Sequence, residues 1–396
     1  MDEKATLEKE GGCSAIARNG DNAMANYVLR RPVLLYETIE TLYQWTNDIS
    51  VERRKADLFR KYGAHLNDEE RQRMEKICQE LQKVYDICDQ LPEDPAMQYY
   101  FGKWETESQW QNICLAKLMV YSFLDIRITD FEDSLRQTLA SAEARLSRPF
   151  LITNINSGGI SFRTPAEGET VPSLIDQLEQ LALGEQYCWR IYKLLKDFPK
   201  ALQEMASLLK PVAQQIAPVL ERVCSLTEKT YNNWSQYFSD HSIQDLLENV
   251  TNQTIREDSL DVYINISLMA VSDILFTYDT QEEKPFHQLY LGVLLSLNIH
   301  LERLQTTEES ICSLLRVLGD RSKFEIMRRI SHSSTYCQAL SREMGLTTAT
   351  ISRHMSLLLD AGLVRAQRKE NRIYYVLERR ALSSLLDTVK SMLLAE

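Results

Sequence analysis

Long hydrophobic segments are absent from this 396-residue sequence. It has no run of eighteen or more apolar residues, the length that a membrane-spanning helix requires. Its first residues, MDEKATLEKEGGCSAIARNG, are polar and lack the apolar core of a signal peptide. We therefore expect a cytoplasmic protein without a membrane partner.

Motifs for metal binding and catalysis are missing as well. The eight cysteines contain no Cys-x-x-Cys pair, and several occupy apolar helical positions, as buried free thiols do. The sequence has no GxGxxG, Walker, HExxH or GxSxG motif. These absences predict a protein that is not an enzyme and that uses no cofactor or metal.

The composition that is present is that of a globular protein with an uneven charge. Hydrophobic residues make up 44% of the chain and charged residues 26%, and the length allows two or three domains. Residues 308–396 hold 14 Lys and Arg against 10 Asp and Glu (net +4), whereas the preceding 307 residues hold 31 against 46 (net −15). The positive C-terminal segment favours nucleic acid as a partner, and the acidic remainder would reduce indiscriminate DNA binding.

Apolar residues recur at helical spacing through residues 31–147 and again through 173–240. In the clearest case Asn67 can cap a helix that ends before Pro92. The buried stripe expected on that helix is Met74, Ile77, Leu81 and Tyr85. Both regions are therefore predicted to be helical.

Three features interrupt this helical pattern. Residues 150–172 are rich in polar and glycine residues and can form either a hairpin or a loop over a cavity. Residues 260–297 contain short β-favouring runs, which predict a small strand element packed on the helices. Prolines are expected to divide the helices of the second region, namely Pro199, Pro211 and Pro218.

We therefore predict a mainly α protein in three parts. Residues 1–27 are polar and expected to be a flexible tail. Residues 28–305 are expected to form a large, mainly helical sensing or assembly domain with a small strand element. Residues 308–396 are expected to form a winged helix-turn-helix that binds DNA.

The winged helix-turn-helix prediction rests on residues 341–377, SREMGLTTATISRHMSLLLDAGLVRAQRKENRIYYVL. Gly345 allows a tight turn and Thr347 can cap the second helix. That helix would bury Ile351, Met355, Leu358 and Leu359. Its outward face would carry Thr348, Ala349, Ser352, Arg353 and Ser356, which can enter a major groove and offer donors to DNA. Two strands and a basic turn then follow, as in a DNA-binding wing.

The helices around this motif complete the predicted module. Asp320 can cap a helix over roughly 321–331, and Thr335 can cap the next. The first of these is expected to direct Phe324, Met327 and Ile330 into the core. The long apolar stripe of the last helix, with the helix near 311–318, predicts a dimer surface or docking onto the N-terminal domain. The residues assigned to dimerisation are Ile311, Leu314, Leu315, Leu385, Val389 and Met392.

With these residues in place, the segment resembles the ArsR family of bacterial winged-helix repressors. The likeness covers about 85 residues, beginning at LGDRSKFEIMRRI, and the long preceding region resembles the N-terminal extensions of some ArsR-like regulators. The family's DNA-reading pattern, S-x-[ST]-[TV]-x-S-R-H-L, falls on Thr347 to Met355, with Ser352, Arg353 and His354 as its S-R-H. The resemblance implies a homodimer that binds an inverted-repeat operator, usually as a repressor, and releases it when an effector binds.

The sequence departs from the family's metal-sensing members. The two cysteine positions of their Cys-Val-Cys motif hold Tyr336 and Gln338 here, with Cys337 between them. No histidine follows His354, so the His and Asp ligand set of other members is missing too. Because metal sites of these types need three or four convergent ligands, we expect no metal site and an unknown non-metal effector or partner instead.

The predicted function is thus a dimeric, DNA-binding transcriptional regulator acting on double-stranded DNA. Two alternatives stay open: a winged helix that binds a protein, or an N-terminal enzyme domain regulated by a winged helix. The side chains predicted to contact DNA are Thr347, Thr348, Ala349, Thr350, Ser352, Arg353, His354, Arg368, Lys369, Asn371, Arg372 and Tyr374.

Overall fold

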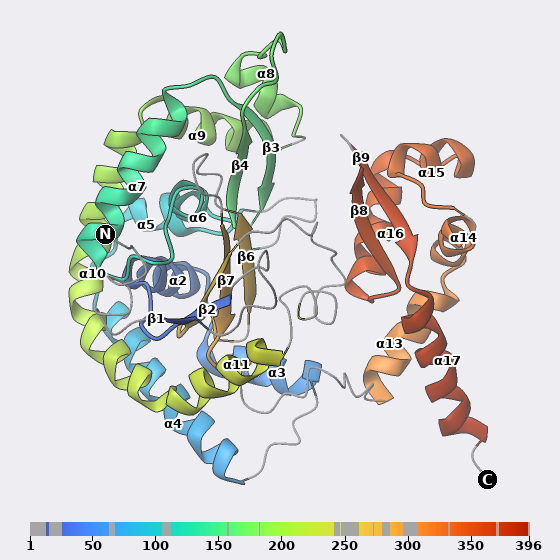
Figure 1. Ribbon diagram of the computed structural model, residues 1–396, viewed down its shortest axis with the longest axis horizontal. Helices are drawn as coiled ribbons and strands as arrows, with labels where there is room; N and C mark the ends of the chain where they lie inside the picture. Colours follow the sequence, from blue (N-terminus) through green and yellow to red (C-terminus); the bar gives the residue numbers. More distant parts are fainter. Residues whose placement is uncertain are drawn as a thin grey trace. The chain divides into compact units, whose positions relative to one another are not determined.

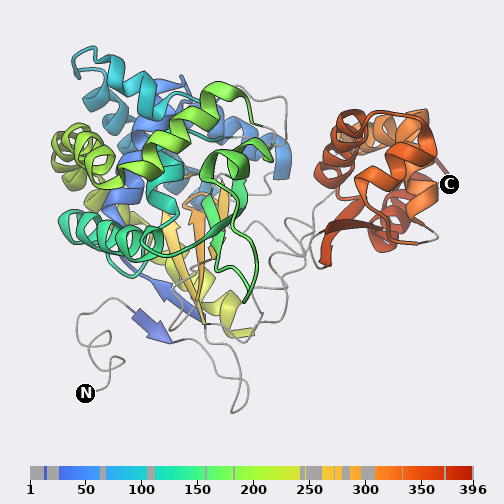
Figure 2. The same cartoon turned by 90° about the horizontal axis from the view of Figure 1, so that it is seen from above.

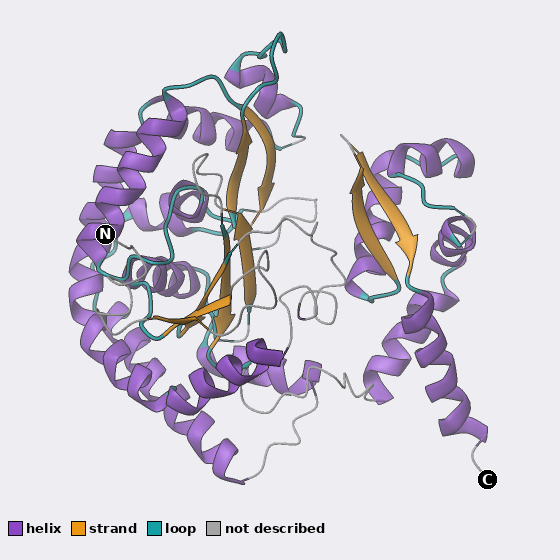
Figure 3. Cartoon of the chain, viewed as in Figure 1, coloured by secondary structure: helices purple, strands orange, loops and turns teal. Residues whose placement is uncertain are grey.

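The computed structural model describes two compact units of the chain, which we treat separately (Figure 1). The described residues are 13–15, 26–62, 68–104, 112–156, 158–181, 183–240, 246, 261–271, 273–278, 286–295, 308–331, 333–369 and 372–394. The N-terminal unit takes in 13–58, 68–240 and 261–295 of these, and the C-terminal unit takes in 308–394 together with residue 246 and residues 59–62, which end a helix that starts in the N-terminal unit. The described chain is mainly helical, as the sequence predicts (Figure 3).

The N-terminal unit combines a sheet, a hairpin and many helices. Its strands are β1 (Cys13–Ala15), β2 (Asn26–Leu29), β3 (Leu151–Asn156), β4 (Gly159–Arg163), β5 (Val262–Ser267), β6 (Ile274–Tyr278) and β7 (His287–Gly292). Its helices are α2 (Leu34–Thr46), α3 (Val51–Tyr62), α4 (Asp68–Cys88), α5 (Pro95–Phe101), α6 (Leu115–Tyr121), α7 (Phe131–Leu146), α8 (Leu174–Glu179), α9 (Glu185–Lys196), α10 (Phe198–Leu226) and α11 (Glu228–Asp240).

The sheet has the order β1-β2-β5-β7-β6. Strands β2, β5 and β7 run parallel, and β1 and β6 pair antiparallel at the two edges. Every residue of β5 and β7 is buried, as is usual for parallel strands covered by helices. The strands predicted within 260–297 are therefore confirmed. Strand β1 and the first two residues of β2 lie within residues 1–27, the range predicted to be a flexible tail.

Helix α2 forms an inner layer between the sheet and the outer helices. Figures 1 and 2 show α2, α7 and α10 on the same side of the sheet, with α10 outermost. Ten consecutive residues of α2, Leu35 to Gln44, are buried, so its polar side chains need internal partners. The Glu37 carboxylate accepts hydrogen bonds from the backbone N–H groups of Leu268 (3.0 Å) and Met269 (2.7 Å), directly after β5.

A buried ion pair joins α2 to α6. Lys117 Nζ lies 2.8 Å from Glu40 Oε1, and both side chains are 5% exposed. The Tyr121 hydroxyl also donates to Glu40, at 2.9 Å. Burial acts to raise the pKa of Glu40, but the charge and hydrogen bond of Lys117, the charge of Arg54 and the hydrogen bond of Tyr121 together outweigh burial, and the pKa is lowered overall. These contacts hold α2 against α6 and give the buried charges of Glu40 and Lys117 a partner.

The long helix α10 differs from the sequence prediction. Pro211 and Pro218 were expected to divide the helices, yet both lie inside α10. They are seven residues apart and exposed, so they share the solvent-facing side of the helix, where solvent can reach the backbone carbonyls that lack an N–H donor from proline. The opposite side buries apolar residues such as Leu209, Val212 and Ile216 in the core. Burial of that face keeps the helix continuous.

The predictions for residues 150–172 and for the buried stripe of α4 agree with the structure. Residues 150–172 contain the antiparallel hairpin β3–β4, one of the two alternatives left open. Helix α4 buries its predicted stripe, whose members are 7% exposed or less. Its predicted cap, Asn67, lies outside the described residues.

The C-terminal unit is a winged helix-turn-helix. Its elements are α13 (Glu308–Gly319), α14 (Arg321–Ile330), α15 (Cys337–Met344), α16 (Thr348–Asp360), β8 (Val364–Lys369), β9 (Arg372–Leu377) and α17 (Arg379–Leu394). Its core holds Ile326, Met327, Ile330, Leu340, Ile351, Met355, Leu358, Leu363, Val364, Tyr375 and Leu385. The buried stripe predicted for the second helix of the motif is therefore confirmed at Ile351, Met355 and Leu358.

Two predictions for this unit are wrong. Phe324, expected in the core, is 56% exposed, and Ile326 is buried in its place, whereas Met327 and Ile330 are buried as predicted. Thr335 does not cap α15, whose N-cap is Tyr336 without a side-chain bond. The Thr335 backbone pairs instead with Tyr375, whose N–H donates to the Thr335 carbonyl at 2.7 Å.

Candidate nucleic-acid interface

The turn between α15 and α16 depends on Gly345. This residue has φ 66° and ψ 24°, the left-handed conformation that glycine adopts without strain, and its N–H donates to the Ser341 carbonyl. The Ser341 hydroxyl donates to the Leu346 carbonyl at 2.7 Å, which holds the turn from the other side. The two helices are thereby fixed in helix-turn-helix geometry.

Thr347 starts α16 as the sequence predicts. Its Oγ1 accepts a hydrogen bond from the Thr350 backbone N–H at 3.1 Å, and the two threonine hydroxyls are 2.8 Å apart. The Thr348 hydroxyl is directed back to Ser341 at 3.4 Å. Thr347 and Thr350 therefore have a structural role at the helix start, while Thr347 and Thr348 stay exposed.

Arg353 is the exposed cation on the outward face of α16. Its neighbours Ser352 and Ser356 are half-buried, and the Ser356 hydroxyl donates to the Ser352 carbonyl at 3.2 Å. Within the described part of the chain, no hydrogen bond or ion pair engages the Arg353 guanidinium. Its donors are therefore available to an external acceptor. The side chain of Ala349, also assigned to this face, lies outside the described residues.

His354 has a different environment from Arg353. Its side chain is half-buried, and its buried Nδ1 has no hydrogen-bond partner among the described residues. Burial lowers its pKa below the usual value; the positive charges of Lys323 and Arg353 act in the same direction, and Asp320 opposes them. The imidazole is thus neutral near pH 7 and adds no positive charge to the face.

The wing is the hairpin β8–β9, in which Lys369 pairs with Arg372 and Arg368 with Ile373. Tyr374, on β9, is half-buried and packs edge-on against Tyr336, with ring centroids 5.6 Å apart. The structure describes only the backbones of the three basic wing residues predicted to contact DNA, which are Arg368, Lys369 and Arg372. Asn371, also predicted to contact DNA, lies outside the described residues. Their roles stay predictions.

The residues assigned to dimerisation do not share one environment. Leu385 is 2% exposed and belongs to the unit's own core, so its side chain forms no exposed surface. Leu314 and Val389 pack against that core and are half-buried, and Leu315 is 39% exposed. The side chains of Ile311 and Met392 lie outside the described residues.

Several exposed apolar side chains of this unit are not among the residues assigned to dimerisation, although Leu386 and Leu393 belong to the apolar stripe expected on the last helix. Phe324 on α14 and Leu386 and Leu393 on α17 are 56%, 53% and 75% exposed. Leu386 lies next to Leu385 in the sequence, so a helical pattern alone did not separate the inward residue from the outward one. These side chains are candidates for a contact surface.

Over the described ranges, no group of three or more His, Cys, Asp or Glu residues is placed to hold a metal ion. The Cys337 thiol lies 3.6 Å from the Tyr375 hydroxyl, and burial raises its pKa. No helix in the described part of the chain is both long and apolar enough to cross a membrane.

Residues 320–366 match the family model for the bacterial regulatory protein, arsR family. The chain carries an ArsR-family helix-turn-helix domain. We call the C-terminal unit, residues 308–394, the ArsR-type domain. The chain is 29% identical over 93 residues to the HTH-type transcriptional regulator YgaV of Escherichia coli strain K12, and the match covers 23% of this chain and 94% of that protein.

Solved structures also resemble part of the chain. A predicted DNA-binding transcriptional regulator from E. coli is 29% identical, covers 24% of this chain and 99% of its own, and has a TM-score of 0.19. NolR from Sinorhizobium fredii is 21% identical, covers 22% and 85%, and has the same TM-score, 0.19.

Proposed function

We propose that this protein is a transcriptional regulator, most simply a repressor, whose ArsR-type domain binds double-stranded operator DNA. The observation that carries the proposal is the outward face of α16, where exposed Arg353 has no partner among the described residues. The buried stripe holds this face in place, and Thr347 fixes its start. The likeness to a transcriptional regulator, YgaV, supports the same function.

The regulator is proposed to act as a homodimer. A helix-turn-helix dimer places its two reading helices about one DNA turn apart, roughly 34–36 Å, on a pseudo-palindromic site. Leu315, Leu386 and Leu393 are exposed on the first and last helices of the domain and are available for such a contact. The N-terminal unit is proposed to sense a non-metal effector and to alter DNA binding.

Footprinting on the DNA upstream of the protein's own gene tests the DNA-binding role. If Arg353 contacts a base, Arg353→Ala should weaken specific binding by about 1–3 kcal/mol. The matched control is Arg328→Ala, because Arg328 is also exposed but its guanidinium bonds to Glu325 at 2.8 Å. An unchanged footprint for Arg353→Ala would count against α16 as the reading helix.

A protein-binding winged helix is the competing function. In that case the full-length chain should give no footprint, and its affinity for random and upstream DNA should be equal at every salt concentration. The exposed guanidinium on α16 favours DNA, since a carboxylate-free, donor-rich face suits phosphates and base edges.

A further inference from the structure

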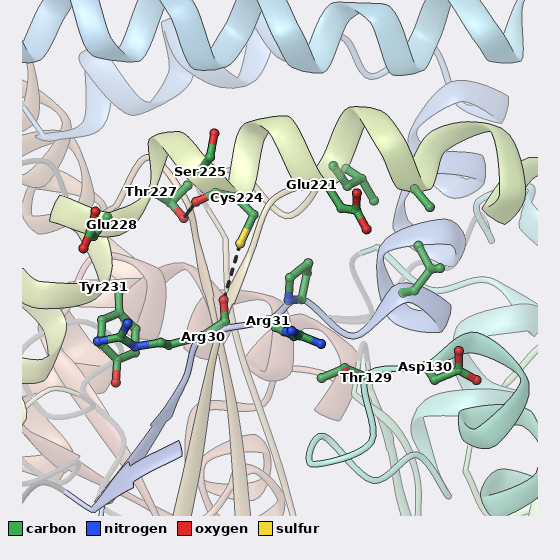
Figure 4. A pocket seen from close by; sticks show the side chains of 14 residues that line it. Arg30, Arg31, Thr129, Asp130, Glu221, Cys224, Ser225, Thr227, Glu228 and Tyr231 are labelled. Atoms are coloured by element: carbon green, nitrogen blue, oxygen red, sulfur yellow. Dashed lines mark hydrogen bonds between the residues drawn. The ribbon is translucent and has the colours of Figure 1, made fainter. Parts of the chain in front are cut away.

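A pocket of about 730 Å³ lies at the carboxyl end of β2 in the N-terminal unit. Arg30 and Arg31, which follow β2, line one side of it, and the end of α10 with the start of α11 lines another (Figure 4). In open α/β sheets, ligands bind outside the carboxyl ends of the strands. The volume also falls within the range of small-molecule sites, about 300–1,000 Å³.

The pocket has an apolar wall with fixed geometry. Ala217, Leu220 and Cys224 are three and four residues apart on α10, so one face of that helix lines the pocket. The Cys224 thiol donates to the Arg30 carbonyl at 3.4 Å, and the Thr227 hydroxyl donates to the Cys224 carbonyl at 2.7 Å. These bonds tie α10 and the start of α11 to the end of β2.

Opposite charges line this pocket without pairing with one another. The Arg30 guanidinium lies 4.6 Å from the centre of the Tyr231 ring, and Figure 4 shows Arg30 reaching toward that ring while Arg31 lies apart from it. Glu221 and Glu228 line the same pocket. Among the described residues, neither arginine forms an ion pair with an acid. Arg30 is occupied by the Tyr231 ring, whereas the Arg31 guanidinium remains available to a ligand.

The mixture of charges selects the class of ligand. Asp130 also lines the pocket, so acids outnumber arginines and a simple anion would meet net repulsion. A simple cation would leave both guanidinium groups without an acceptor. A molecule with a carboxylate at one end and a protonated amine at the other satisfies both sets, and arginine binds carboxylates with paired hydrogen bonds.

We propose that this pocket binds a small zwitterion with an apolar body, its carboxylate on Arg31 and its ammonium group on Glu221. Its role as the effector rests on the proposed function, in which the N-terminal unit is the sensor. The binding site itself does not depend on that role.

Calorimetry on the full chain tests the site with leucine, leucyl-leucine and trileucine, which are zwitterions of increasing length. At least one should bind, and its N-acetyl and C-terminal amide forms, which keep one charge each, should bind at least about tenfold more weakly.

Arg31→Ala and Glu221→Gln should each raise the Kd of the zwitterion by about tenfold or more. The matched controls Arg53→Ala and Glu93→Gln alter exposed residues of the same unit and should leave the Kd unchanged.

Three results would overturn the site: no binding of any of the three zwitterions, equal affinity for the zwitterion and its blocked forms, or an unchanged Kd in Arg31→Ala. Unchanged melting temperatures in the variants ensure that a lost signal is not lost folding. The footprint is then repeated with the bound zwitterion. Binding without any change in the footprint refutes the effector role but keeps the site, whereas a missing footprint refutes the DNA-binding function alone.

Discussion

At the scale of single residues, the most telling group is Glu37, a carboxyl buried in the interior of the N-terminal unit. Burial raises its pKa to about 8, against hydrogen bonds from Ser267, Leu268 and Met269 that favour the charged form. The unfolded chain, with a pKa near the ordinary 4.5, loses this proton first. Between pH 4.5 and 8 the folded state therefore binds more protons than the unfolded state, and the free energy of unfolding must fall as pH rises.

Glu37→Gln removes that titration. We expect the free energy of unfolding of the wild type to fall, relative to that of the variant, as pH rises from 5 to 8, and the difference to level off above pH 8. Denaturant unfolding at a series of pH values measures it. Parallel pH profiles for the two proteins would show that Glu37 titrates normally.

His354 allows a second prediction at this scale. Because burial lowers the pKa of its imidazole, His354 is neutral near pH 7 and supplies no charge to phosphates. We expect His354→Gln to leave the salt dependence of operator binding unchanged between pH 7 and 8. A salt slope reduced by about one unit would instead show a charged phosphate contact at this position.

At the scale of elements, the N-cap of α16 is a local feature whose removal should lower the stability of the domain. Thr347→Ala removes the acceptor for the Thr350 N–H and should destabilise the ArsR-type domain by about 1 kcal/mol. Thr347→Ser, which keeps the hydroxyl oxygen, should restore most of the loss. Thermal unfolding of both variants measures the difference, and equal destabilisation by Ala and Ser would point to the methyl group rather than to the cap.

Local signals in the sequence account for what could be predicted at this scale. Asp320, Gly345 and Thr347 act through bonds to residues two to four positions away, so their roles can be inferred from spacing. Phe324 could not be placed correctly, because both it and Ile326 fit an amphipathic pattern and only the packing of α14 separates them. The continuity of α10 across its prolines also depends on packing rather than on local preference.

Pairings between distant segments could not be predicted. Strand β2 lies beside β5, with Val28 opposite Ile264, although more than two hundred residues separate them in the chain. The pocket follows from that pairing, because Asn265 on β5 donates to the Arg31 carbonyl at 2.7 Å. Arg30 and Arg31 therefore carried no recognisable signal in the sequence, whereas Arg353 was identified from a motif.

At the scale of the whole molecule, the two units have separate cores, and we expect two unfolding transitions. Lys117→Met leaves Glu40 without its cationic partner in the N-terminal core and should lower the free energy of the corresponding transition by about 3–5 kcal/mol. The other transition should not move. Lys103→Met, at an exposed lysine of the same unit, is the control.

Circular dichroism in increasing denaturant measures both transitions. Adding Glu40→Gln to Lys117→Met should recover part of the lost free energy of unfolding, because the double variant no longer buries an unpaired charge. If Lys117→Met shifts the whole curve as one step, the two units unfold cooperatively and the expectation of independent cores is wrong.

The two units also differ in their tryptophan fluorescence. All five tryptophans of the sequence lie before residue 240, in the part of the chain that holds the N-terminal unit, and residues 308–396 contain none. Trp234 follows Tyr231 of the pocket by less than one helical turn of α11. Intrinsic tryptophan emission is therefore a label-free signal of the N-terminal unit alone, because the ArsR-type domain has no tryptophan.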